Sequence, residues 1–169
     1  AWGMTVSHLG VAILTLGITV SGHWSEEKQQ PMKPGQTVTV GPHDYTLVRV
    51  FQAPGPNYTA TRAEFRVTRN RDEVVTLYPE TRRFTTPPMD TTEAGIRSGF
   101  WADLYTVVGE PDGQGGFATR IYFKPLVSWI WLGCLVMVGG GLLSLSDRRH
   151  RVGAPAKTSR TIAAGAAAE

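Results

Sequence analysis

Only one cysteine occurs in the 169 residues of the chain, Cys134. A single thiol excludes an intrachain disulfide. The sequence also lacks the GxSxG, Walker, CxxC and HExxH patterns, and the spacing of its Ser, His and Asp residues predicts no catalytic triad. We therefore predict no catalytic residue, and Cys134 is interpreted as a small packing residue.

Two long stretches lack Asp, Glu, Lys and Arg altogether, residues 1–22 and residues 125–145. At about 1.5 Å per residue, the first makes a helix of roughly 33 Å, and the core of a bilayer is about 30 Å thick. Backbone groups in hydrocarbon must bond to one another, so a helix is expected in both stretches. Trp129 and Trp131, near the start of the second, are typical of a membrane interface. We predict two transmembrane helices, 1–22 and 125–145.

The first predicted span has two distinct faces. Glycine recurs every seven residues at Gly3, Gly10 and Gly17. The other face is small and polar and consists of Thr5, His8, Ala12, Thr15 and Thr19. Small residues let helices approach closely and hydroxyls bond between helices, so we expect both faces to pack against protein in a larger bundle.

His8 is the one titratable side chain in the first span. It lies about 9 Å inside one end of the predicted helix. An ionisable residue within a membrane is a functional hypothesis by default, and neutral imidazole is a common ligand of haem iron and other metals. The alternative is a histidine that only forms a hydrogen bond to a neighbouring helix.

The charges are segregated along the chain. Residues 22–124 hold 12 Lys and Arg against 12 Asp and Glu, so the net charge of +3 comes from the tail after the second span. The positive-inside rule then predicts a cytoplasmic, basic tail over 146–169, a periplasmic domain over 23–124 and a cytoplasmic Ala1. The tail is expected to be disordered because it is rich in Ala and Gly after Val152. Five scattered basic residues beside a membrane are interpreted as a topology signal, and no nucleic-acid partner is expected.

The chain starts with Ala1 and has no basic residue before Lys28. A secretory signal peptide normally has a positive segment ahead of its apolar core. We therefore expect the chain to be the C-terminal part of a longer membrane protein with several spans.

The region between the spans has the pattern of an antiparallel β-rich domain, a barrel or a sandwich. Strands are expected over 36–40, 45–52, 59–68, 74–78 and 81–86, with a hairpin of 103–109 and 116–123. Residues 23–35 are expected to be a polar exit from the membrane, and 91–99 a short helix capped by Thr91 or Thr92. Four arginines could pair with haem propionates or with an acidic partner, although a solvated sheet face is favoured: Arg62, Arg66, Arg82 and Arg83.

Four stretches in order resemble one known family. They are GMTVSHLGVA, GPNYTATRAEFRV, TTEAGIRSGFWADLY and RIYFKPLVSWIWLGCLVMVGGGLLSLSDRR. The resemblance is to the C-terminal region of the CcmF family of cytochrome c-type biogenesis proteins, and it covers residues 2 to about 150.

The resemblance implies a function in cytochrome c maturation. Members of the family are haem lyase subunits of the bacterial inner membrane that receive haem from the chaperone CcmE and help attach it to apocytochrome c, together with thiol-handling subunits. They also hold a haem b in the membrane, and one of its axial histidines lies in a motif that matches His8. The other ligand belongs upstream in the family, so the fragment alone is expected to be inactive. His23 and His43 do not match the family's periplasmic haem motifs.

A second hypothesis is a non-catalytic, membrane-tethered scaffold whose β-domain docks partner proteins. The sequence preceding Ala1 separates the two hypotheses. Further spans with a Trp-rich periplasmic loop favour the haem lyase, and a start codon with a basic segment favours the scaffold.

Overall fold

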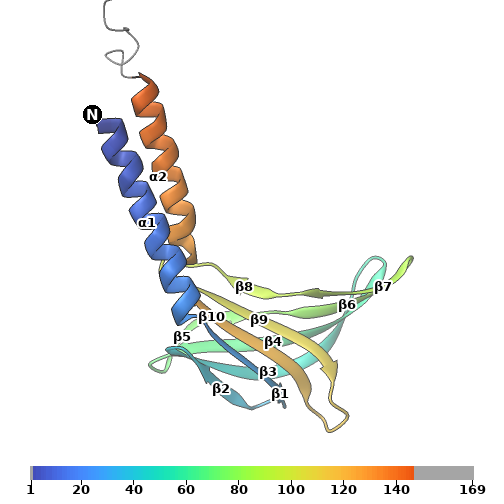
Figure 1. Ribbon diagram of the computed structural model, residues 1–169. Coiled ribbons are helices and arrows are strands. Elements are labelled where there is room, and N and C mark those ends of the chain that lie inside the picture. Colours follow the sequence, from blue (N-terminus) through green and yellow to red (C-terminus); the bar gives the residue numbers. More distant parts are fainter. Residues whose placement is uncertain (1, 147–169) are drawn as a thin grey trace, which may run out of the picture.

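The computed structural model describes residues 2–146. Two long helices, α1 (Trp2–Trp24) and α2 (Val127–Ser146), lie side by side and rise from one end of a β-domain (Figure 1). Both are long and apolar enough to cross a membrane. The predicted spans 1–22 and 125–145 fall on these helices, and that they cross a bilayer stays a prediction. The part of the predicted tail after Ser146 lies outside the described residues.

The glycine face of α1 packs directly against α2, as the seven-residue spacing predicts. Gly3, Gly10 and Gly17 are the buried residues of α1, and Gly133 and Gly140 are those of α2. A Cβ on Gly10 would lie 2.6 Å from the Met137 nitrogen. The two antiparallel helices are therefore in backbone contact along a seam of small residues.

The β-domain consists of two sheets. One has the strand order β1-β10-β9-β8 and the other β2-β3-β4-β6-β7, with β5 also paired to β4; every pair is antiparallel. The strands are β1 (Glu26–Met32), β2 (Thr37–Val40), β3 (His43–Pro54), β4 (Tyr58–Arg69), β5 (Asp72–Leu77), β6 (Glu80–Thr85), β7 (Pro88–Glu93), β8 (Gly95–Arg97), β9 (Ala102–Pro111) and β10 (Phe117–Pro125).

The core lies between the two sheets, so the domain is a sandwich. Alternate residues of the long strands are buried, including Tyr45 and Leu47 of β3 and Phe65 and Val67 of β4, while Ile121 of β10 contributes from the other sheet. Period-two burial is the pattern expected of strands with one face on a core. The alternation in the sequence therefore identified most strands correctly, and the predicted hairpin is β9 with β10.

Two local predictions were wrong. The polar exit contains a strand, β1, which pairs with β10 along its length. Only Met32 of β1 is buried, because β1 is an edge strand, and so its sequence has no alternation to detect. The helix predicted over 91–99 does not form. Thr91, Thr92 and Glu93 belong to β7 and pair with β6, while Gly95 begins β8, because pairing with distant strands outweighs a local capping signal.

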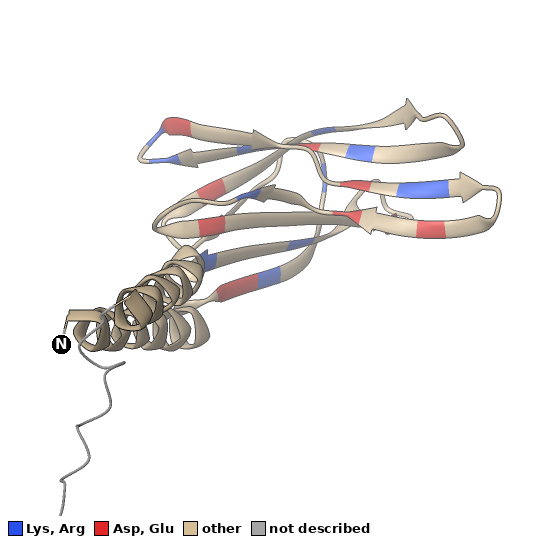
Figure 2. Cartoon of the chain, turned by 90° about the horizontal axis from the view of Figure 1, so that it is seen from above, with Lys and Arg blue, Asp and Glu red and all other residues tan. Residues whose placement is uncertain are grey.

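The β-domain is joined tightly to both helices. Only Ser25 separates α1 from β1, and only Leu126 separates β10 from α2. The Leu126 nitrogen donates to the Trp101 carbonyl at 2.9 Å, and Ser128 Oγ donates to the Gly99 carbonyl at 2.8 Å. Figure 2 shows charged residues spread over the strands and none on the two helices. A charge-free helix pair is thus attached at short range to a charged sandwich.

Candidate functional site

His8 lies on the side of α1 that faces away from α2. It is two residues from the buried Gly10, which corresponds to about 200° around an α-helix. Its side chain is exposed within the described part of the chain, as are Thr5, Ala12, Thr15 and Thr19. Of the two faces predicted to pack against protein, the glycine face has its partner here, and the polar face is left open.

One nitrogen of the His8 ring is held by the helix itself. Nδ1 lies 2.8 Å from the Met4 carbonyl oxygen, one turn back. A carbonyl can only accept, so Nδ1 carries a proton, and in the neutral form of the ring the lone pair is on Nε2. Ligating histidines commonly have this arrangement, because the second hydrogen bond fixes the tautomer and the ring orientation.

The surroundings of His8 suit a flat ligand. Ala12 and Thr5 lie one turn to either side, and the Thr15 hydroxyl donates to the Val11 carbonyl at 2.9 Å, so it is used within the helix. Met4 and Val11 supply apolar exposed surface beside the imidazole. A lone imidazole among small side chains, with exposed apolar surface beside it, can therefore present one nitrogen to a large planar group.

The donor set is that of a single axial ligand. Among residues 2–146, no three His, Cys, Asp or Glu side chains gather in a way that could hold a metal ion. A bare Zn²⁺ or similar ion needs three or four protein ligands, whereas the iron of haem needs only axial ones. The residues present therefore fit one side of a haem and do not fit a multi-ligand metal centre.

His23 provides a comparison on the same helix. Its Nδ1 lies 3.0 Å from the Thr19 carbonyl, the same local arrangement as His8, and its ring contacts Trp24 at 6.2 Å between centroids. It lies about 22 Å further along the helix axis than His8, at the end next to the β-domain. What distinguishes His8 is thus its position within the apolar segment.

The four arginines considered as anion ligands all form ion pairs with acidic residues of the β-domain. Arg62 and Arg82 both pair with Glu80, which is buried. Burial opposes ionisation of Glu80, but the hydrogen bonds from Arg62 and Arg82 outweigh it and hold its pKa below the usual range. Arg66 pairs with Glu73, and Arg83 with Asp90 and Glu110. Arg62 and Arg82 are thus half-buried and structural, and only Arg66 and Arg83 match the predicted solvated face.

His43 was set aside on the sequence, and the structure places it in a cavity. Its side chain is 6% exposed, and its buried Nδ1 has no hydrogen-bond partner. Burial lowers the pKa of His43, the charges of Arg69 and Arg97 lower it further, and Asp44 opposes them. The ring is therefore neutral at pH 7. The cavity residues His43, Arg69 and Arg97 come from β3, β4 and β8, so no local spacing in the sequence links them.

Comparison with known proteins identifies relatives over nearly the whole chain. Residues 23–125 match the family model described as the CcmF C-terminal beta-sandwich. Cytochrome c-type biogenesis protein CcmF of Pseudomonas aeruginosa is 42% identical over 151 residues, which cover 89% of this chain and 23% of that protein. Cytochrome c-type biogenesis protein CycK of Rhizobium meliloti is 40% identical over 163 residues, covering 96% and 24%.

A solved structure shares the fold. The chain matches the structure titled Cytochrome c Heme Lyase CcmF with a TM-score of 0.64 and 20% identity, over 85% of this chain and 24% of that one. The chain thus spans about a quarter of the length of the relatives it matches.

Proposed function

The chain belongs to the CcmF family of cytochrome c-type biogenesis proteins, and from this premise we propose that it is the part of a haem lyase that supplies His8 as one axial ligand of a membrane haem b. The observation that carries the proposal is the His8 ring. Its Nδ1–H is held by the Met4 carbonyl at 2.8 Å, and the ring lies on the exposed face of a charge-free helix.

The seam with α2 supports the same role. Backbone contact through the glycines prevents α1 from turning about its axis, so His8 keeps one direction. An imidazole whose direction and tautomer are both set loses little entropy on ligation. When bound, the haem would supply electrons for reducing the haem that is to be attached. The second ligand comes from outside this chain, because His8 is the only histidine in either predicted span.

The proposal includes a place and partners. We place the β-domain in the periplasm and both helices in the bacterial inner membrane, because the basic tail follows α2 closely. Partners are the haem chaperone CcmE, apocytochrome c and its thiol-handling subunits. An alkaline phosphatase fusion in the β9–β10 turn, after Gly113, should be active, and one after Val152 inactive. The reverse pattern contradicts this topology.

The test of His8 uses the full-length parent protein with a matched control. His8→Ala removes the ligand without adding charge, so the helix should still insert, and haem b per protein should fall to a small fraction of the wild-type value. His23→Ala removes the same side chain with the same local hydrogen bond from the same helix. It should keep full haem.

Two readouts separate ligation from packing. The absorption spectrum of the purified protein, normalised to protein content, gives haem occupancy, and the yield of c-type cytochrome gives function. A lost interhelical hydrogen bond would cost only about 0.6–2 kcal/mol and would leave haem bound. Full haem content in His8→Ala ends the ligand proposal.

A further inference from the structure

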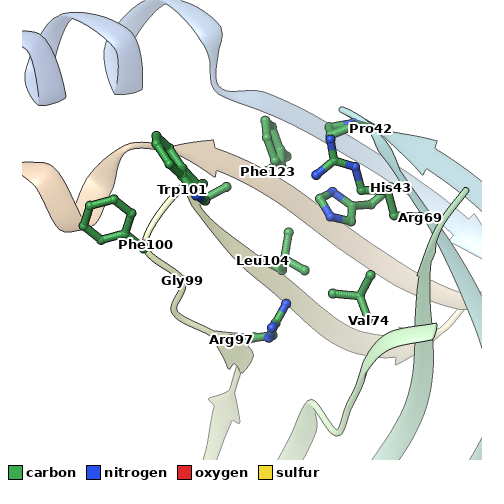
Figure 3. Close-up of a pocket in the computed structure, with 11 residues that line it drawn as sticks. Pro42, His43, Arg69, Val74, Arg97, Gly99, Phe100, Trp101, Leu104 and Phe123 are labelled. Atoms are coloured by element: carbon green, nitrogen blue, oxygen red, sulfur yellow. The ribbon is translucent and has the colours of Figure 1, made fainter. Parts of the chain in front are cut away.

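A cavity of about 580 Å³ opens at the end of the sandwich nearest the helices. This volume lies in the range of small-molecule sites, about 300–1,000 Å³. Figure 3 shows the Arg69 guanidinium beside the His43 ring, with Arg97 entering from the opposite side and Leu104 and Val74 between them. The cavity thus has cationic walls and an apolar floor.

The cavity arginines differ from almost all others in the described domain, because neither has an acidic partner. Six other arginines form ion pairs with Asp or Glu: Arg49, Arg62, Arg66, Arg82, Arg83 and Arg120. Arg69 and Arg97 instead face each other across His43, and both charges act on its ring. Two unpaired guanidiniums on one cavity form a site for an anion with several oxygens, such as phosphate.

His43 adds a buried ring nitrogen that has no hydrogen-bond partner in the described part of the chain. His43 is only 6% exposed, and its Nδ1 forms no hydrogen bond within residues 2–146. Buried polar atoms are normally satisfied, so an unpartnered ring nitrogen in a cavity between two cations indicates a missing hydrogen-bond partner. A neutral imidazole can donate one N–H to an oxygen of the bound anion.

The rim of the cavity is aromatic and continuous with α2. Phe100 and Trp101 are 55% and 68% exposed, and their rings lie 5.6 Å and 5.8 Å from that of Trp129, in the first turn of α2. Figure 3 shows Phe100 beside this turn. Trp129 Nε1 is also buried and has no hydrogen-bond partner among the described residues. Exposed aromatic rings at the end of an apolar helix are typical of the level of lipid head groups.

We propose that this cavity binds the head group of an anionic phospholipid, with the phosphate between Arg69 and Arg97 and the acyl chains along Phe100, Trp101 and α2. The proposal rests on the membrane placement of α2 given above. It is independent of His8, which lies at the other end of the helix pair. A free phosphate could meet the same two arginines. The aromatic rim favours the lipid, and the experiment compares the two ligands directly.

The experiment titrates the chain, labelled with ¹⁵N-histidine, in an uncharged detergent. The probes are dihexanoyl phosphatidylglycerol, dihexanoyl phosphatidylcholine and free glycerol phosphate, and the readout is the chemical shift of the His43 ring. The anionic lipid should shift it saturably and bind at least about tenfold more tightly than the other two. Equal binding of the zwitterionic lipid, equal binding of glycerol phosphate, or no saturable shift overturns the proposal.

The variants use a neighbouring arginine as the control. Arg69→Gln and Arg97→Gln should each raise the Kd for the anionic lipid at least about tenfold, the loss expected for one charge-assisted contact. Arg71→Gln removes the same charge two residues from Arg69, has no acidic partner either and does not line the cavity. It should change the Kd less than about twofold. An equal effect of all three variants would show general charge attraction and contradict a built site.

The readout separates this proposal from the one for His8. The His43 titration contains no haem, so a failure of His8 as a ligand leaves its result unchanged. The reporter fusions test the membrane placement on their own. A lipid that fails to bind in protein with the expected topology therefore counts against the cavity alone.

Discussion

Replacing Gly140 by alanine should weaken the pairing of α1 with α2, whereas the same change at its neighbour Gly139 should not. A Cβ on Gly140 would lie 2.5 Å from the Ser7 nitrogen and 2.8 Å from the Gly3 oxygen. Both are backbone atoms, which cannot rotate away. A Cβ on Gly139 would have no atom within 4 Å.

The magnitude follows from these distances. Ordinary contacts between such atoms lie near 3.5–4.0 Å, so the helices must separate by about 1 Å at Gly140. Inserting a methyl group into a well-packed contact costs about 1–3 kcal/mol. Alanine at Gly139 fills open space and favours the helix by up to about 1 kcal/mol. The two variants should therefore change the free energy of unfolding in opposite directions.

Unfolding by sodium dodecyl sulfate in mixed micelles, followed by tryptophan fluorescence, measures the difference. Circular dichroism of the β-domain checks that the sandwich is intact in both proteins. Equal stability of Gly140→Ala and Gly139→Ala would refute the close contact of the two helices, and with it the fixed direction of His8.

Two further predictions concern the β-domain. Glu80→Gln removes the buried carboxylate shared by Arg62 and Arg82, so urea unfolding should show a loss of about 1.5–3 kcal/mol at pH 7. Glu64→Gln should lose less than about 1 kcal/mol, because its partner Arg49 is 65% exposed. Because the folded pKa of Glu80 is depressed, its contribution should be full above about pH 4.3 and be lost as pH falls through the folded value. The pKa of His43 is also lowered, so its contribution is full above about pH 6.5 and is lost as pH falls through the folded value; His43→Phe should abolish this loss, and an unchanged profile contradicts it.

The parts of the fold with one buried face could be predicted from the sequence. β4 and the β9–β10 hairpin alternate between buried and exposed residues, and the two helices lack charge. β1 could not be found in this way, because an edge strand with six exposed residues has no apolar period. Its Pro31 also argues against a strand, although an edge tolerates the missing amide.

The two candidate sites also differ in whether local sequence reveals them. His8 could be singled out from local sequence alone, because an imidazole within a stretch of 22 residues without charge is unusual. The structure adds that its face is the one left open by α2. The cavity could not be predicted, because His43, Arg69 and Arg97 meet only when β3, β4 and β8 come together across the two sheets.

The most direct test of the central claim, that His8 ligates haem iron, is chemical rescue. Full-length His8→Ala protein is produced with increasing imidazole in the medium, and haem b per protein is read from the absorption spectrum. We expect little haem without imidazole, a saturable rise with it, and no response in His23→Ala. Full haem in His8→Ala without imidazole would contradict the claim.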